Sequence, residues 1–133
     1  MSIDNDDKYA ELTRKKICLE KLSTIARVVT AELKLQTING QNFMWYDNSF
    51  KNEIKRDIDL LIVDGPPRII NKNARYPALP LLKDHFSDNI VILVDDVKRK
   101  DDSDTVNRWI KKLDHFESEF FATEKGAYIL RKK

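Results

Sequence analysis

Cysteine, glycine and long apolar runs are all scarce in this sequence of 133 residues. Its only cysteine, Cys18, excludes an intrachain disulfide and a cysteine-rich metal site. No apolar run approaches the roughly 20 residues that cross a bilayer. The start of the chain is polar and acidic, which is unlike a secretory signal. The sequence therefore predicts a cytoplasmic protein with no membrane partner.

An excess of one charge sign is also lacking. The chain has 24 Lys and Arg against 22 Asp and Glu, a formal net charge of +2. The basic cluster at residues 98–100 is followed directly by Asp101 and Asp102, which favours a solvated loop. Nucleic-acid-binding proteins normally carry a basic face or stripe. We therefore expect no nucleic-acid partner.

Two unbroken apolar segments of strand length, residues 60–63 and 90–94, are rich in β-branched side chains. Such segments are typical of parallel strands that are buried on both faces. Alternation of apolar and polar residues over 32–36 predicts a strand with one exposed face, near an edge. Residues 120–122 and 127–130 flank a glycine-containing turn and predict a hairpin at the end of the chain.

Three segments have the spacing of helices, one before these strands at residues 6–22 and two between them at residues 76–85 and 103–113. Ser103 or Asp104 could cap the last of them, and Trp109 on its apolar side is expected in the core. Alternating strands and helices before a final hairpin predict an α/β fold. We expect one domain over residues 1–133, with a Rossmann-like, mostly parallel sheet flanked by helices.

Carboxylates follow both apolar strands at the point where each strand ends. Asp64 comes after the first strand, and Asp95 and Asp96 come after the second. Because ligands of open α/β sheets bind at the carboxyl ends of the strands, these side chains are candidates for one site. Aspartates at strand ends also cap the following helix or bind turn amides. The pattern alone favours neither role.

The same residues carry a resemblance to a known family. The segments concerned are Asp-Leu-Leu-Ile-Val-Asp-Gly-Pro-Pro at 59–67, Ala-Arg-Tyr-Pro-Ala-Leu at 74–79, Ile-Leu-Val-Asp-Asp at 92–96 and Arg-Trp at 108–109. Together they resemble class I S-adenosylmethionine-dependent methyltransferases, and the final hairpin resembles the antiparallel last strand of that fold. The resemblance covers nearly the whole chain, and the Asp-Gly-Pro-Pro and Asp-Asp pair is its most specific part.

This resemblance implies a cofactor, a reaction and a set of acidic residues. The cofactor is S-adenosylmethionine, and Asp4 matches the family's acidic residue that hydrogen-bonds the ribose hydroxyls. The implied reaction is methyl transfer to an oxygen of a small molecule, with Asp64 and Asp95 as catalytic residues. In related O-methyltransferases the positions of Asp64, Asp95 and Asp96 hold a divalent metal, so Mg²⁺ is a candidate ion, and oxygen ligands suit it.

Two residues that follow the Asp-Gly-Pro-Pro segment are candidate substrate ligands. Arg75 could pair with a substrate carboxylate or phosphate, and Tyr76 beside it could face the same cleft. An alternative for Arg75 is a bridge to Asp64 or Asp95 that stabilises the loop.

The sequence also departs from the family. Its three glycines are Gly40, Gly65 and Gly126, and none belongs to the Gly-x-Gly turn that lets the backbone approach the cofactor. Matched to the family, the chain starts within the second strand, without the first strand and helix. The strand around Leu61 would then have an unpaired apolar edge, which invites pairing with another chain. We expect a homodimer or a partner chain at this edge, and a non-catalytic remnant or subunit is the alternative function.

Overall fold

The computed structural model describes residues 1–113 and 115–133. The chain forms two compact units, Met1–Lys55 and Arg56–Lys133. Each unit is described by itself, and the expectation of a single domain stays a prediction. No helix in the described part of the chain is long and apolar enough to cross a membrane.

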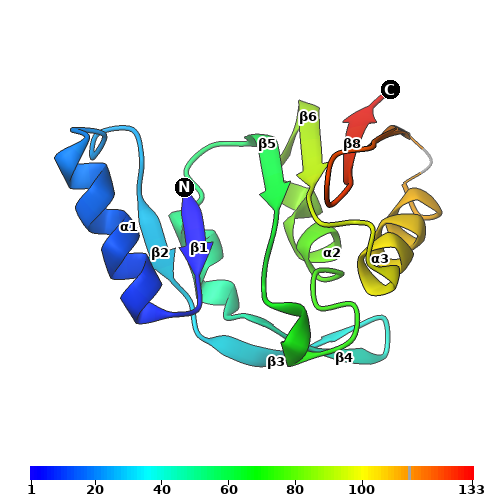
Figure 1. Cartoon of the computed structure of the whole chain (residues 1–133), viewed down its shortest axis with the longest axis horizontal. Helices are drawn as coiled ribbons and strands as arrows, with labels where there is room; N and C mark the ends of the chain where they lie inside the picture. The colour runs from blue at the N-terminus through cyan, green and yellow to red at the C-terminus, as the bar shows by residue number, and fades with distance from the viewer. Residues whose placement is uncertain (114) are drawn as a thin grey trace. The chain divides into compact units, whose positions relative to one another are not determined.

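The first unit contains two small sheets and one long helix (Figure 1). Its elements are β1 (Ser2–Asp4), α1 (Asp7–Leu19), β2 (Val28–Thr30), β3 (Leu33–Ile38), β4 (Gln41–Tyr46) and the 3-10 helix η1 (Asn48–Glu53). Strand β1 pairs with β2 in parallel, and β3 pairs with β4 as an antiparallel hairpin.

Helix α1 confirms the predicted helix over residues 6–22, although it ends earlier. The Asp6 carboxylate caps it by accepting hydrogen bonds from the backbone N–H groups of Lys8 and Tyr9, at 2.8 and 3.2 Å. The apolar side chains of α1 do not form a buried stripe, since Leu19 is 81% exposed. Cys18 is exposed too.

The β3–β4 hairpin contains the strand predicted at residues 32–36. Its turn, Asn39-Gly40, has both residues at positive φ, 51° and 75°, as a tight two-residue turn requires. Trp45 and Tyr46 on β4 are buried with their ring centroids 4.9 Å apart.

The second unit is built around one mixed sheet (Figure 1). Its elements are β5 (Ile58–Val63), the 3-10 helix η2 (Arg68–Ile70), α2 (Ala78–Leu82), the 3-10 helix η3 (Lys83–His85), β6 (Phe86–Val94), α3 (Lys100–Ile110), β7 (Phe116–Phe121) and β8 (Ala127–Lys132). The strand order is β5-β6-β8-β7, with β5 parallel to β6 and β8 antiparallel to both of its neighbours.

This arrangement confirms the predicted α/β fold with a sheet flanked by helices and a C-terminal antiparallel hairpin. The details of the helices differ from the prediction. Helix α3 begins at Lys100 with no side-chain cap, so the predicted caps Ser103 and Asp104 are wrong. Trp109 on α3 is 2% exposed, which confirms its predicted place in the core.

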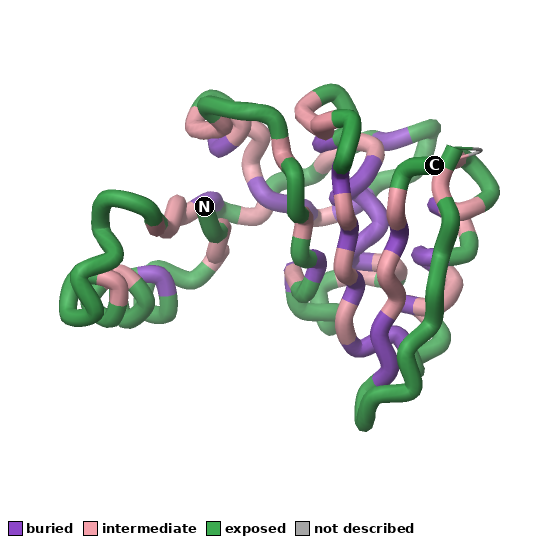
Figure 2. The backbone as a smooth tube through the Cα atoms, turned by 90° about the horizontal axis from the view of Figure 1, so that it is seen from above, coloured by how far each residue is buried: buried purple, intermediate pink, exposed green. Residues whose placement is uncertain are grey.

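Buried positions alternate with less buried ones along the second half of β6 (Figure 2), so the two faces of the sheet differ in burial. On one face Ile92 and Val94 of β6 are completely buried, as is Leu130 of β8. On the other face Leu60 and Ile62 of β5 are 57% and 59% exposed. The prediction that residues 60–63 are buried on both faces is therefore wrong, because Leu60 and Ile62 remain more than half exposed.

Candidate functional site at the ends of β5 and β6

Asp64 and Asp95 follow paired strands and lie at the same edge of the sheet. Val63 and Val94, the last residues of β5 and β6, are partners in the parallel register. One further backbone contact continues the pairing, as the Asp95 N–H donates to the Val63 carbonyl at 3.3 Å. The chain turns away after Asp64 through a cis Gly65–Pro66 peptide. The structure thus brings together the backbones of these two predicted site residues.

Arg75 links the two strand ends. Its Nη1 donates to the carbonyl oxygen of Asp95 at 2.7 Å, and its Nη2 donates to the carbonyl oxygen of Asp64 at 2.9 Å. The same Nη2 also donates to the Asp64 carboxylate at 3.1 Å. Because Arg75 is only 5% exposed, its guanidinium acts as an internal bridge between the loops.

A buried carboxylate lies against this guanidinium. Asp102 on α3 has Oδ1 3.6 Å from Nη1 of Arg75, and its side chain is only 4% exposed. Burial raises the pKa of Asp102 above its ordinary value, because it disfavours the charged form more than the nearby Arg75 and Arg99 favour it. The expectation of a solvated loop concerned residues 98–100, which are exposed, whereas Asp102 close to them is buried.

We expect this raised pKa to make stability depend on pH. The folded chain binds a proton at Asp102 more tightly than the unfolded chain does, so the stabilisation is present at low pH and is lost as the pH rises through the folded-state pKa. Urea unfolding between about pH 4 and about pH 7 should therefore show wild type losing stability relative to Asp102→Asn. Asp101→Asn changes the same charge at the next position and serves as the control. If the difference in stability between wild type and Asp102→Asn stayed constant with pH, or if wild type gained stability relative to Asp102→Asn as the pH rose, the expectation would be contradicted.

Tyr76 is fully buried beneath cationic side chains. Its hydroxyl accepts a hydrogen bond from Nζ of Lys112 at 3.0 Å, and the guanidinium of Arg108 lies 3.7 Å from its ring centroid. Its carbonyl oxygen accepts a hydrogen bond from the Trp109 indole at 3.0 Å. Burial of both Arg75 and Tyr76 gives no support to their predicted contact with a substrate. In this structure they join the loop after β5 to α3 and to the end of β6.

The carboxylate of Asp96 lies near two cationic side chains. It has a left-handed backbone, with φ of 59°, and its carboxylate is 3.4 Å from Arg99 and 3.7 Å from Lys125. Among residues 1–113 and 115–133, no group of three or more acidic, His or Cys side chains could hold a metal ion. Asp64, Asp95 and Asp96 therefore do not form such a group in the described part of the chain, and the predicted Mg²⁺ site stays a prediction.

The residues present fit only part of S-adenosylmethionine. Asp4 ends β1, and its Oδ1 accepts a hydrogen bond from the Asp6 N–H at 2.9 Å, so a half-exposed carboxylate stands directly before α1. Glycines at positive φ occur only in hairpin turns, Gly40 between β3 and β4 and Gly126 between β7 and β8. The chain therefore offers an acidic residue for ribose hydroxyls but no glycine turn for the rest of the cofactor.

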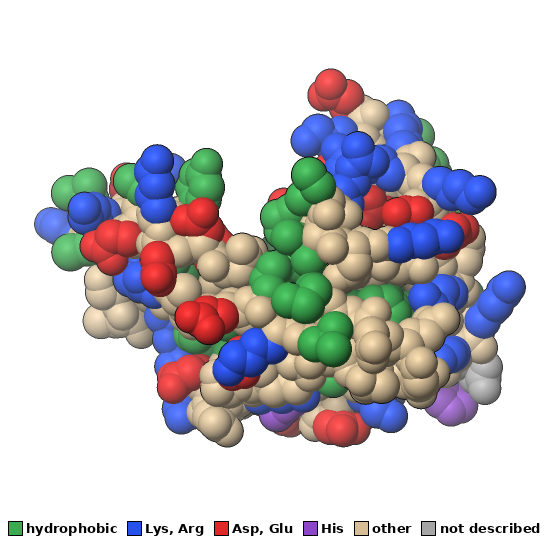
Figure 3. Space-filling model, turned by 90° about the horizontal axis from the view of Figure 1, so that it is seen from below, with side chains coloured by type: hydrophobic (Ala, Val, Ile, Leu, Met, Phe, Trp, Pro, Cys, Tyr) green, Lys and Arg blue, Asp and Glu red, His purple; other side chains and the backbone are tan. Residues whose placement is uncertain are grey.

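Two exposed residues near the strand ends had no predicted role. Arg68 and Ile69 lie in η2, directly after Asp-Gly-Pro-Pro, and Ile69 is 89% exposed. Hydrophobic side chains gather among charged ones on the face seen from below (Figure 3). The Asp-Gly-Pro-Pro segment pointed to this loop, but the sequence holds no signal that separates its exposed side chains from buried ones.

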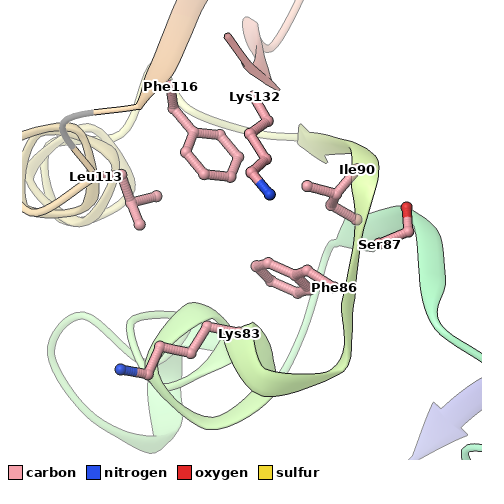
Figure 4. Close-up of a pocket in the computed structure, with 7 residues that line it drawn as sticks. All are labelled: Lys83, Phe86, Ser87, Ile90, Leu113, Phe116 and Lys132. Carbon is pink, nitrogen blue, oxygen red and sulfur yellow. The ribbon is translucent and has the colours of Figure 1, made fainter.

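A pocket of about 160 Å³ lies at the opposite end of β6 (Figure 4). The side chains that line it come from η3, β6, β7, β8 and the residues after α3, namely Lys83, Phe86, Ser87, Ile90, Leu113, Phe116 and Lys132. Phe86 begins β6, whereas Asp95 follows its last residue. This pocket is therefore separate from the candidate site.

Comparisons with solved structures identify the fold. The O-methyltransferase from Bacillus cereus in complex with S-adenosylhomocysteine matches 98% of this chain with a TM-score of 0.69 and 12% identity. A methyltransferase from Geobacter sulfurreducens matches with a TM-score of 0.65 and 14% identity, and the S-adenosylhomocysteine-bound methyltransferase PaMTH1 from Podospora anserina with 0.58 and 15%, each over 98% of this chain. No family model and no curated protein matches the sequence.

These similarities show that the chain has the fold of class I methyltransferases. It spans 61%, 56% and 59% of these three solved chains, respectively, which is less than two thirds of their length. The chain is thus a methyltransferase-like domain in fold.

Proposed function

We propose that this chain is the larger part of a methyltransferase domain that transfers a methyl group from S-adenosylmethionine to an oxygen of a small molecule. The observation that carries this proposal is the likeness over 98% of the chain to methyltransferases solved with S-adenosylhomocysteine. Asp4 is proposed to accept hydrogen bonds from the ribose hydroxyls. The proposed partner is thus a small-molecule methyl acceptor, in a cytoplasmic protein.

Asp64 is the better placed of the two proposed catalytic residues. Its side chain is 68% exposed, while Arg75 fixes its backbone and one carboxylate oxygen. A carboxylate anchored in this way can accept the proton of an acceptor hydroxyl. Asp95, half-buried and held by Arg75 through its carbonyl, is proposed to orient that hydroxyl. Mg²⁺ is not included, because the described residues do not form its ligand set.

A titration with S-adenosylhomocysteine tests the role of Asp4. Two-dimensional amide NMR spectra of the chain, recorded up to about 5 mM ligand, should show weak saturable shifts at residues 4–6. Asp4→Asn can still accept the Asp6 N–H but loses the charge, so we expect affinity to fall by about tenfold or more.

Asp7→Asn provides the matched control, since it removes a neighbouring exposed carboxylate in the first turn of α1. Its affinity should equal that of wild type. Absence of any shift at the highest concentration, or equal losses in both variants, would contradict the proposed ribose contact.

A second function, a non-catalytic subunit or remnant that acts through self-association or a partner chain, has an observation of its own. The 133 residues contain no Gly-x-Gly turn, and one face of the sheet in the second unit exposes apolar side chains. Normal ligand shifts at residues 4–6 without methyl transfer to any hydroxyl acceptor would favour this alternative.

A further inference from the structure

The pocket at the start of β6 lies on the buried face of the sheet in the second unit. Phe116 and Lys132 are partners in register on β7 and β8, so their side chains share one face. Lys132 is two residues after Leu130 on β8, and alternate residues of a strand point to the same face. Since Leu130 is completely buried, this face carries the core. The pocket is therefore the place where the core opens at one end of the sheet.

The walls of this pocket are mainly apolar. Phe86 and Phe116 contribute two phenyl rings, and Ile90 and Leu113 contribute aliphatic side chains (Figure 4). Ile90 is 1% exposed and belongs to the core, whereas Phe86 and Phe116 are half-buried. The two rings would bury more of their surface if a further apolar group lay between them, and such burial is favourable. The walls thus favour a ligand with an apolar body.

The size of the pocket suits one aromatic ring. Its volume is about 160 Å³. In other proteins an apolar cavity of about 150 Å³ binds benzene. A ring placed beside phenyl side chains also gains from edge-to-face or offset contact, in addition to the burial of its surface. A single six-membered ring is therefore the apolar body that these walls accommodate best.

One cationic group is directed into the pocket. Figure 4 shows the amino group of Lys132 pointing into the open space, whereas that of Lys83 points away from it. Nζ of Lys132 donates to Oδ1 of Asp88 at 2.7 Å. The Asp88 side chain is 96% exposed, so solvent weakens this ion pair and a ligand carboxylate can share or replace it. Apolar walls lower the local dielectric, which strengthens the attraction of Lys132 for an anion in the pocket.

We propose that this pocket binds a small aromatic carboxylate, whose single ring lies between Phe86 and Phe116 and whose carboxylate pairs with Lys132. A neutral ring would lack the ion pair, and an acid without a ring would leave the apolar walls uncovered, so both parts of the ligand are needed. The pocket is at the opposite end of β6 from Asp95. This carboxylate is thus a second ligand, distinct from the methyl acceptor, and its binding does not depend on the proposed function.

Three probe compounds test the need for both ring and charge. Phenylacetate has both, phenylacetamide has the ring without the charge, and acetate has the charge without the ring. In methyl NMR spectra of the chain, phenylacetate should cause saturable shifts of the Ile90 and Leu113 methyl groups with a Kd of about 1 mM. Its ring protons should show nuclear Overhauser contacts to the same methyl groups. We expect phenylacetamide and acetate to bind more weakly by about fivefold or more.

Two substitutions on β8 test the role of Lys132. Lys132→Gln keeps a side chain that can donate to Asp88 but removes the charge, so affinity for phenylacetate should fall by about fivefold or more, and affinity for phenylacetamide should stay unchanged. Arg131→Gln is the matched control. It removes the same charge from the next residue, whose side chain lies on the opposite face and pairs with Glu119. Its affinity for phenylacetate should equal that of wild type.

Three results would overturn the proposal. The first is no saturable shift of Ile90 or Leu113 up to about 20 mM phenylacetate. The second is equal affinity for phenylacetate and phenylacetamide, and the third is an equal loss of affinity in Lys132→Gln and Arg131→Gln. Unchanged methyl signals of Ile92, which is completely buried on β6, show in each variant that the sheet is folded. No S-adenosylmethionine or S-adenosylhomocysteine is present, so failure here is separate from failure of the proposed function.

Discussion

Replacing Arg75 with alanine is expected to lower the free energy of unfolding of residues 56–133 by about 3–5 kcal/mol. The substitution removes the hydrogen bonds to the carbonyl oxygens of Asp64 and Asp95 and leaves the buried Asp102 carboxylate without its nearest cation. Trp109 is the only tryptophan of this unit. Urea unfolding followed by Trp109 fluorescence in a Trp45→Phe background therefore measures the effect.

Arg131→Ala is the matched control in the same unit. Arg131 pairs with Glu119 at 3.1 Å, but the two side chains are 41% and 57% exposed, so we expect a loss of under about 1 kcal/mol. Adding Asp102→Asn to Arg75→Ala should restore part of the lost stability, because it removes the unpaired buried charge. Equal losses from Arg75→Ala and Arg131→Ala would refute the bridging role of Arg75.

The sequence predicted the part of the candidate site that depends on strand order. Two apolar segments followed by aspartates indicated neighbouring parallel strands, and β5 and β6 pair in this way with Asp64 and Asp95 at one edge. This prediction succeeds because backbone pairing requires only strand length and apolar character, which are local properties. The role of Arg75 stayed open, since burial of a side chain is decided by residues distant in sequence.

Other features were missed although a local signal was present. Asn39-Gly40 is among the strongest signals for a tight hairpin turn, and it joins β3 to β4, yet β4 was not predicted. Asp102 received no predicted role, because the sequence indicated a solvated loop at residues 98–100 and a helix only from residue 103. It lies instead on the inner side of α3, where Arg75 compensates part of the cost of burial.

A third group of features could not be predicted from these residues. The apolar run over 60–63 has the composition of a strand buried on both faces, but Leu60 and Ile62 are exposed in the structure. The composition of a strand indicates whether its faces are suited to burial, whereas its exposure depends on which residues are present to pack against it.

Trp109→Ala should lower the free energy of unfolding of the second unit by about 3–5 kcal/mol, the usual cost of truncating a buried aromatic side chain to alanine. Trp109 is 2% exposed and its indole N–H donates to the Tyr76 carbonyl, so the substitution creates a cavity and leaves that oxygen without this donor. Hydrogen exchange of residues 90–94, which form the buried part of β6, measures the loss.

Trp109→Phe separates the effect of the cavity from that of the lost hydrogen bond, because it keeps most of the buried apolar volume and removes only the indole donor. We expect it to cost about 1–3 kcal/mol, and Trp45→Ala in the first unit provides a comparison at an equally buried tryptophan. Exchange at residues 2–4 and 28–30 in the first unit should respond to Trp45→Ala. If Trp109→Ala left exchange at residues 90–94 unchanged, α3 could not be the helix that covers the buried face of the sheet. The contacts of Arg75, Tyr76 and Asp102 with α3 would then not be what holds the ends of β5 and β6 together.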